Sequence, residues 1–215
     1  MSGHGHSHGG HGHSHGCDDD DHQVEDFSTE FSLHTKIDDQ GFQCLGEEES
    51  GTGRKIFKNY TDRQDKSIFV DTDCDPELLI NVPFTGSVKL KNIIIVPGED
   101  DLKPLKVKLF KNCPGLTFDD ANKKKPDQEI DIVPDPLGEA QYQIKVSKFN
   151  STNHLSFFFP ESEGEEQTRI YYIGMRGSYE KVSRQPIVIT NYELAANPAD
   201  HKNKLYEANM GNLGH

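Results

Sequence analysis

The chain has 215 residues and a formal net charge of −13 at pH 7, and its hydrophobic residues (33%) include 12 Phe and 7 Tyr but no Trp. This length suffices for one well-buried domain or two small ones, and the apolar content excludes a wholly disordered chain. The acidic balance argues against binding to nucleic-acid backbones or anionic membranes, which attract basic residues. No apolar run reaches the roughly 20 residues of a membrane-spanning helix.

Residues 1–26 are predicted to form a disordered tail. The unit His-Gly-His-Ser-His-Gly occurs at residues 4–9 and again at 11–16, and four consecutive Asp follow at 18–21. Gly, Ser, His and Asp offer little apolar area to bury, so the segment cannot offset the entropy lost on ordering. A second flexible tail is expected at the other end, over residues 202–215.

The histidines of the first tail form a candidate metal site. Removal of Met1 would expose Ser2-Gly3-His4, where an amine, two deprotonated amides and an imidazole can surround Cu²⁺ or Ni²⁺ in a square plane. The remaining imidazoles could hold Zn²⁺ or Ni²⁺ loosely. The candidate ligands are His4, His6, His8, His11, His13 and His15. We expect this binding to be adventitious and expect no cofactor.

Residues 27–201 are predicted to form the folded domain. Segments with strand composition occur at 78–82, 88–96, 107–110, 130–133, 142–146, 155–159, 170–175 and 187–192. Turns rich in Gly and Pro separate them, including one at 83–86, and no segment has a clear helical period. The segment at 27–45 fits either a broken helix or packed coil. The series predicts an all-β sandwich or barrel.

The strand at 88–96 is expected to be central. It starts with alternating apolar and charged residues and ends as Ile93-Ile94-Ile95-Val96. Successive side chains of a strand point to opposite faces, so an uninterrupted apolar run indicates a strand covered on both sides. Ile94 should therefore be fully buried.

Two patterns that suggest ligand binding lack a required residue. Residues 46–52 have the glycine spacing of a phosphate-binding loop, but Thr52 stands where that loop needs Lys. Asp71, Asp73 and Asp75 alternate as Ca²⁺ ligands can, but the glycine and distal Glu of an EF-hand are missing. We therefore interpret the first as an ordinary loop and the second as a solvated acidic loop.

No catalytic residue is identified. The cysteines, Cys17, Cys44, Cys74 and Cys113, are widely spread without a C-x-x-C pair, and we interpret them as free thiols. His154 is interpreted as a structural residue at the start of a strand. The first residues lack the apolar stretch of a secretory signal, so the expected location is the cytoplasm, with the nucleus as a second compartment.

Several segments, in this order, resemble the PITH domain family, the proteasome-interacting domain found at the C-terminus of a thioredoxin-like protein. The matching segments are QCL at 43–45, LLINVPF at 78–84, VKLKNIII at 88–95, KLFKN at 108–112, FDD at 118–120, YIGMRG at 172–177 and YELAANPADH at 192–201. Each one alone is weak, whereas the ordered series is specific. The chain lacks a C-x-x-C motif and a thioredoxin domain, so thioredoxin chemistry is not implied.

The resemblance implies a jelly-roll β-sandwich of the galactose-binding-like type. It also implies a non-catalytic interaction module that binds the 26S proteasome as a regulatory or accessory factor, and we expect a monomer without nucleic-acid or membrane partners. The stretch at 176–184 departs from the two-domain relative, which weakens the transfer of proteasome binding. The alternatives are a lectin-like sandwich, which the lack of Trp disfavours, and metal binding through the tail.

Overall fold

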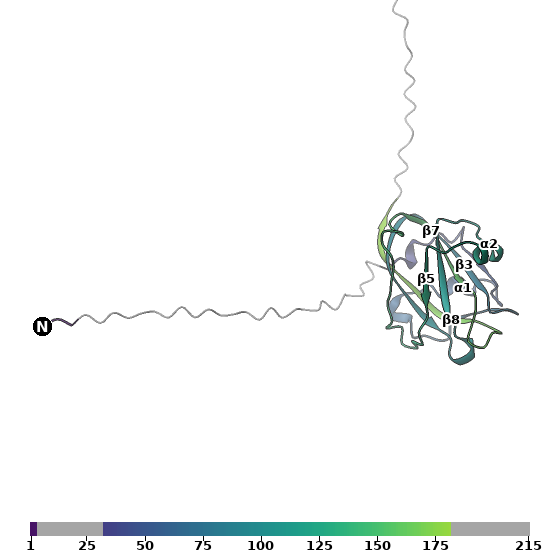
Figure 1. The fold of residues 1–215 in the computed structure, drawn as a ribbon, viewed down its shortest axis with the longest axis horizontal. Coiled ribbons are helices and arrows are strands. Elements are labelled where there is room, and N and C mark those ends of the chain that lie inside the picture. Colours follow the sequence, from purple (N-terminus) through teal and green to yellow (C-terminus); the bar gives the residue numbers. More distant parts are fainter. Residues whose placement is uncertain (4–31, 182–215) are drawn as a thin grey trace, which may run out of the picture. The chain divides into compact units, whose positions relative to one another are not determined.

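The computed structural model describes residues 1–3 and 32–181. Its strands are β1 (Gln43–Leu45), β2 (Val70–Asp71), β3 (Leu78–Pro97), β4 (Lys106–Lys111), β5 (Gln128–Asp131), β6 (Tyr142–Gln143), β7 (Thr152–Phe159) and β8 (Arg169–Glu180) (Figure 1). Its helices are α1 (Thr52–Lys55) and α2 (Phe118–Lys123), with 3-10 turns at His34–Lys36, Tyr60–Asp62 and Asp100–Leu102. No helix in the described residues is long and apolar enough to span a bilayer.

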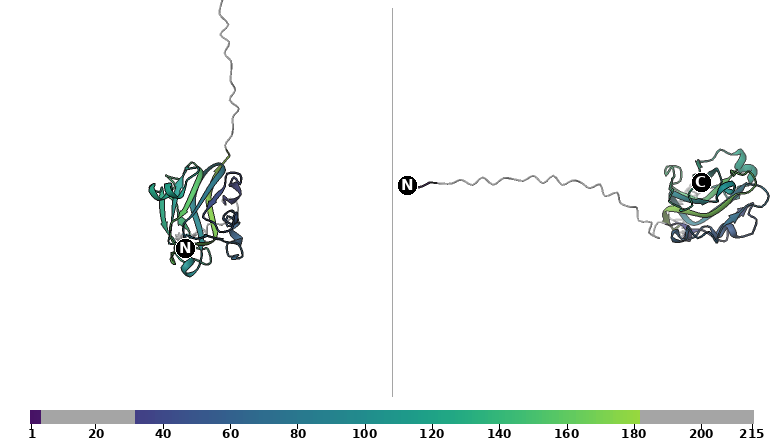
Figure 2. Two further views of the ribbon diagram at one scale, coloured as in Figure 1. Left: turned by 90° about the vertical axis from the view of Figure 1, so that its right-hand side faces the viewer. Right: turned by 90° about the horizontal axis from the view of Figure 1, so that it is seen from below.

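The strands pair antiparallel throughout and form two layers that share β3. The first part of β3, residues 78–83, pairs with β1 and β7, and β4 and β5 continue that layer beyond β7. The second part, residues 87–97, pairs with β8 and β6, and β2 follows β8. Further views of the ribbon show these layers from two other sides (Figure 2). The domain is therefore an antiparallel β-sandwich.

The long strand β3 bends back on itself between Pro83 and Val88, where its register with β7 shifts. Twenty residues in a straight strand would span about 66 Å. Instead both ends of β3 lie beside the start of β8, as two hydrogen bonds show. Just before β3, the carbonyl of Pro76 accepts from Thr168 Oγ1 at 2.7 Å. Just after β3, Gly98 N donates to the carbonyl of Arg169 at 2.7 Å. The turn predicted at 83–86 coincides with this bend, but the strand continues through it, so the two predicted strands form the single bent strand β3.

A hydrophobic core fills the space between the layers. Ile80 and Phe157 enter it from the first layer and Ile95 and Ile173 from the second, and all four side chains are fully buried. Phe57 reaches the same core from the segment after α1, with its ring centroid 6.0 Å from that of Phe157. Apolar contact between the layers is therefore the main stabilising interaction of the sandwich.

The outer faces of the layers are also covered. On the first layer, Leu79 and Phe158 pack against Leu116 and Ala121, which α2 and the loop before it supply. On the second layer, Ile94, Val96, Tyr171 and Tyr172 form a buried cluster on the outer face. A sheet covered on both faces accounts for the continuous apolar run that the sequence showed.

The prediction that the 88–96 segment is central is confirmed. Ile93 and Ile95 point into the core between the layers, whereas Ile94 packs in an outer cluster with Tyr172. Partly buried Phe69 packs against the same cluster. Ile94 is only 1% exposed, as the apolar run on both faces predicted.

Other predicted elements differ from the structure in extent. The strand predicted at 142–146 is limited to Tyr142–Gln143, and the two short helices were not anticipated. The part of the 27–45 segment that the structure describes, from residue 32, contains only a 3-10 turn and β1, which agrees with packed coil. The strand predicted at 187–192 and both predicted tails lie outside the described residues.

Candidate functional site

The metal site predicted in the first tail lies outside the described residues. Its candidate ligands are His4, His6, His8, His11, His13 and His15, and the site stays a prediction. Among residues 1–3 and 32–181, no group of three or more His, Cys, Asp or Glu side chains is placed to hold a metal ion.

The three alternating aspartates have different environments. Asp71 forms an ion pair with Arg169 in the neighbouring strand β8, and its Oδ1 accepts from Arg169 Nε at 2.6 Å. This hydrogen bond is the main reason that the pKa of Arg169 is raised. Asp73 and Asp75 are exposed. The interpretation as a solvated loop thus holds for two of the three, while Asp71 binds the adjacent strand.

The glycine-rich loop at 46–53 binds a protein carboxylate through its backbone amides. Glu47 Oε1 accepts from Gly51 N at 2.7 Å, and Oε2 accepts from Gly53 N at 2.8 Å. Gly51 has a left-handed backbone (φ 88°) and precedes the one-turn helix α1. The amides that a phosphate would need are already satisfied, which agrees with the rejection of a phosphate-binding loop.

His154 lies in β7 beside the loop that follows β4. Its backbone N–H and that of Asn153 both donate to Asn112 Oδ1, at 3.2 and 2.9 Å. The ring Nδ1 of His154 is buried and has no hydrogen-bond partner in the structure, and burial lowers the pKa of the ring. His154 thus lies near the start of a strand, as predicted, and its structural role stays a prediction.

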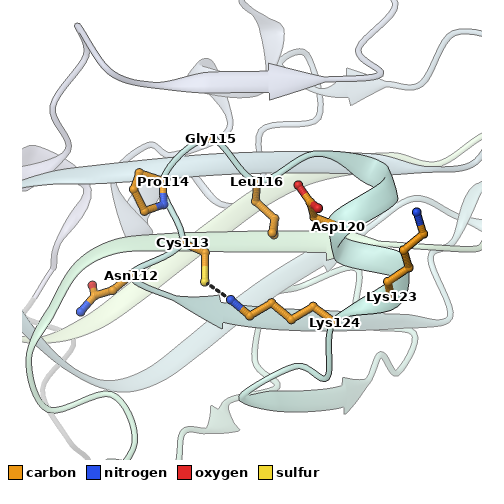
Figure 3. Close-up of a pocket in the computed structure, with 8 residues that line it drawn as sticks. All are labelled: Asn112, Cys113, Pro114, Gly115, Leu116, Asp120, Lys123 and Lys124. Carbon is orange, nitrogen blue, oxygen red and sulfur yellow. Dashed lines mark hydrogen bonds between the residues drawn. The ribbon is translucent and has the colours of Figure 1, made fainter.

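A pocket of about 480 Å³ opens between the end of β4 and the helix α2 (Figure 3). It is lined by Asn112, Cys113, Pro114, Gly115, Leu116, Asp120, Lys123 and Lys124. In its wall, Lys124 Nζ donates a hydrogen bond to Cys113 Sγ at 2.7 Å. Cys113 Sγ also donates to the backbone carbonyl of Lys111 at 3.3 Å. The pocket thus places a cysteine sulfur beside an ammonium group.

Backbone geometry holds both members of this pair. Asn112, directly before Cys113, has a left-handed backbone (φ 52°), and its side chain bonds to three backbone groups of residues 151–154. Lys124 caps α2, and its backbone N–H donates to the carbonyl of Asp120 at 2.8 Å. The sequence reasoning missed this pair, because eleven residues of separation carry no pairing signal.

A second surface lies on two loops that meet beside the end of β3. Leu105, Val133 and Leu137 are 38%, 49% and 48% exposed, and we name them the apolar loop surface. The two loops are joined by a hydrogen bond from Ile132 N to the carbonyl of Leu105 at 2.8 Å. Within residues 32–181, these are the large hydrophobic side chains with substantial exposure.

Charged side chains lie on the residues that flank Leu105 in the chain and in a pocket beside these loops. A neighbouring pocket of about 380 Å³ is lined by Pro97, Gly98, Glu99, Asp100, Lys103, Pro134, Asp135, Pro136 and Glu163. Ion pairs join Lys103 to Glu163 at 2.5 Å and Lys106 to Glu161 at 2.8 Å. An apolar centre with a charged rim is the usual composition of a protein-binding surface.

Solved structures share the fold at low sequence identity. The CBM32-1 and CBM32-2 domains of Clostridium perfringens ZmpB, in complex with GalNAc, superpose with a TM-score of 0.50 and 11% identity. The match covers 72% of this chain and 38% of that one. The chain is a jelly-roll β-sandwich of the galactose-binding-like type, so the predicted fold class is confirmed.

Sequence comparisons identify much closer relatives. The PITH domain model matches residues 23–196. A PITH domain-containing protein of Drosophila pseudoobscura pseudoobscura is 51% identical over 204 residues, which cover 95% of this chain and 96% of the relative. PITH domain-containing protein 1 of Homo sapiens is 42% identical, over 93% of each chain. The chain therefore belongs to the PITH domain family.

Proposed function

We propose that the chain is a non-catalytic interaction module that binds the 26S proteasome and acts as a regulatory or accessory factor. The proposal extends to this chain the partner that its resemblance to PITH domains implies, and membership of that family supports it. We further propose that the chain acts as a monomer in the cytoplasm or nucleus.

The apolar loop surface is the observation that carries this proposal. Its three apolar side chains remain exposed to solvent in the folded domain, on loops that the β-sandwich holds in place. Exposed apolar side chains beside charged groups are typical of sites for protein partners. We propose that Leu105, Val133 and Leu137 contact the proteasome.

The alternative function, sugar binding, has less support. Likeness to a GalNAc complex at 11% identity concerns the fold, and one fold hosts many functions. Sugar sites favour exposed aromatic platforms. The largely exposed hydrophobic side chains among the described residues are Met1, Leu105, Val133 and Leu137, and none of them is aromatic.

Binding of the purified chain to purified 26S proteasome tests the proposal. The measurement is an affinity titration with the native chain and with a variant that carries Leu105→Asp, Val133→Asp and Leu137→Asp together. The matched control is Ser147→Asp, an exposed position between β6 and β7. We expect the control to bind like the native chain and the triple variant to lose affinity by about tenfold or more, as for interface anchors.

The two possible failures are distinct. If the native chain does not bind the proteasome, the proposed function is wrong. If it binds, and the triple variant binds equally well with an unchanged melting temperature, the proposed contact surface is wrong. A glycan array with the native chain measures the sugar-binding alternative directly.

A further inference from the structure

Cys113 and Lys124 are in direct contact, because Lys124 Nζ donates a hydrogen bond to Cys113 Sγ at 2.7 Å. We propose that Cys113 and Lys124 are an oxidation-sensitive pair, which hydrogen peroxide converts into a covalent bridge of sulfur, oxygen and nitrogen.

The three cysteines that the structure describes differ in their neighbours. Burial, followed by the nearby Glu47 carboxylate, raises the pKa of Cys44. The hydrogen bond to Asp73 raises the pKa of the exposed Cys74. Both neighbours are carboxylates, which oppose the thiolate that reacts with peroxide. Cys113 Sγ instead accepts a hydrogen bond from the Lys124 ammonium at 2.7 Å.

The surroundings give an oxidant access to the sulfur. Cys113 is half-buried in the wall of the open 480 Å³ pocket, and Lys124 is exposed. The pKa of Lys124 is raised, mainly by its hydrogen bond to Cys113. Before oxidation, the lysine is therefore an ammonium. The backbone anchors of Asn112 and of the end of α2 keep the two groups together.

The reaction balances with two molecules of peroxide. The Cys113 thiolate attacks one peroxide oxygen, the O–O bond breaks, and the Lys124 ammonium protonates the departing hydroxide. The products are a sulfenic acid, a neutral amine and water. The amine attacks the second peroxide to give a hydroxylamine and water, and condensation with the sulfenic acid releases a third water and leaves the S–O–N bridge. Sulfur and nitrogen each lose two electrons, which the two peroxides accept, and the four peroxide oxygens end as three waters and the bridging oxygen.

The bridge would fasten the segment between β4 and the end of α2. That segment supplies Leu116 and Ala121 to the cluster that covers the first layer. A cross-link between residues 113 and 124 restricts the unfolded chain, as a disulfide does. The bridged protein should therefore melt at a higher temperature than the reduced protein, and its 114–123 segment should resist proteolysis.

The test is peroxide treatment of the purified chain, followed by digestion and mass spectrometry. We expect a linked peptide that joins Cys113 to Lys124. Its mass should equal the sum of the two free peptides plus one oxygen and minus two hydrogens. Treatment with dithiothreitol should separate the two peptides again. The variants are Cys113→Ser and Lys124→Arg, which keeps the charge but removes the amine. The matched control is Lys123→Arg, because Lys123 lines the same pocket.

The native chain and Lys123→Arg should form the linked peptide, and the other two variants should not. Trapping of sulfenic acid with dimedone should label Cys113 about tenfold faster than Cys44 or Cys74. A linked peptide absent from the native chain, or equally abundant in Lys124→Arg, would overturn the proposal. Equal labelling of the three cysteines would overturn it as well.

Discussion

Single polar side chains complete the loops of this domain by accepting hydrogen bonds from backbone amides. Glu47 does so for two amides of its loop, and Asp135 Oδ2 accepts from Ala140 N at 2.6 Å. Asn112 Oδ1 accepts from two amides of β7. Part of the acidic excess therefore has a structural role, because Glu47 and Asp135 accept hydrogen bonds that hold their loops.

His154 should make the domain less stable in acid. Burial lowers its pKa in the folded state below the unfolded value of about 6.5, so the unfolded chain binds the proton more readily. Stability from this residue is fully present above about pH 6.5 and is lost as pH falls toward the lowered folded pKa. Melting temperatures near pH 7.5 and pH 5 should differ less in His154→Gln than in the native chain.

The neighbouring substitution Asn153→Gln provides the control for His154. Asn153 is exposed and neutral at both pH values, so this variant should keep the native pH dependence. An equal loss of stability in acid for the native chain and His154→Gln would contradict the role assigned to burial of the ring.

Ile94 should be among the costly positions in the core. Its side chain is 1% exposed and packs on the outer face of β3 with Val96 and Tyr172. Ile94→Ala should lower the free energy of unfolding by roughly 2–5 kcal/mol, through lost transfer energy and a cavity. Chemical denaturation measures the change. The exposed control Leu137→Ala should lower the free energy of unfolding by about 0.5 kcal/mol or less. If Ile94→Ala left the free energy of unfolding unchanged, the outer cluster would be loosely packed.

At the scale of elements, β3 organises the sandwich because it pairs in both layers. Its second half pairs with β8 over most of its length, with register shifts after Leu90 and Val96. Opposite Leu90, the partner residue is Gly177. A Cβ built on Gly177 would lie 2.1 Å from the carbonyl oxygen of Lys89, a backbone atom of β3. Close approach of the two strands therefore requires glycine at this position.

Gly177→Ala should destabilise the domain by forcing β3 and β8 apart. The clash involves backbone, which cannot rotate away as a flexible side chain can, so a loss of about 1–3 kcal/mol is expected. The measurement is denaturant unfolding, with Ser178→Ala as the control at the next, exposed position. Two variants of equal stability would show that the strands can separate without loss.

At the scale of the whole molecule, charge is distributed unevenly over the surface. Carboxylates dominate the pocket beside the end of β3, and Asp73, Asp75 and Glu77 line a smaller pocket of about 200 Å³. Lysines gather instead at the Cys113 pocket, where Lys123 and Lys124 stand. A charged partner would therefore meet a negative potential at the two acidic pockets and a positive one near Lys123 and Lys124. In physiological salt such potentials act over about 8 Å.

The purified chain should not reduce insulin disulfides at the rate of a thioredoxin. Cys44, Cys74 and Cys113 are free thiols in the structure, and the sequence has no C-x-x-C pair. Thioredoxin chemistry needs a second thiol that resolves the mixed disulfide. A turbidity assay with insulin and dithiothreitol measures the rate. Turnover that exceeds the dithiothreitol background, and disappears in a Cys113→Ser variant, would contradict this prediction.

The local pattern of the sequence predicted most of the longer strands and the all-β class, but neither β1 nor β2. Composition marked most strands, and the uninterrupted run at 93–96 identified the central one, because side-chain alternation in a strand is a local property. The resemblance to PITH domains added the jelly-roll topology. The helix α2 was missed, since six residues started by the Thr117 cap are too short for a helical period.

Only the tertiary structure decided which distant residues meet. Asp71 and Arg169 are 98 positions apart, and their ion pair depends on the pairing of β2 with β8. Cys113 and Lys124 meet because the 114–123 segment folds onto the first layer. The sequence by itself determined which segments are strands and which faces are apolar. Contacts between segments depend on which strands pair on each side of the bend in β3, and the local turn signal at 83–86 does not specify those partners.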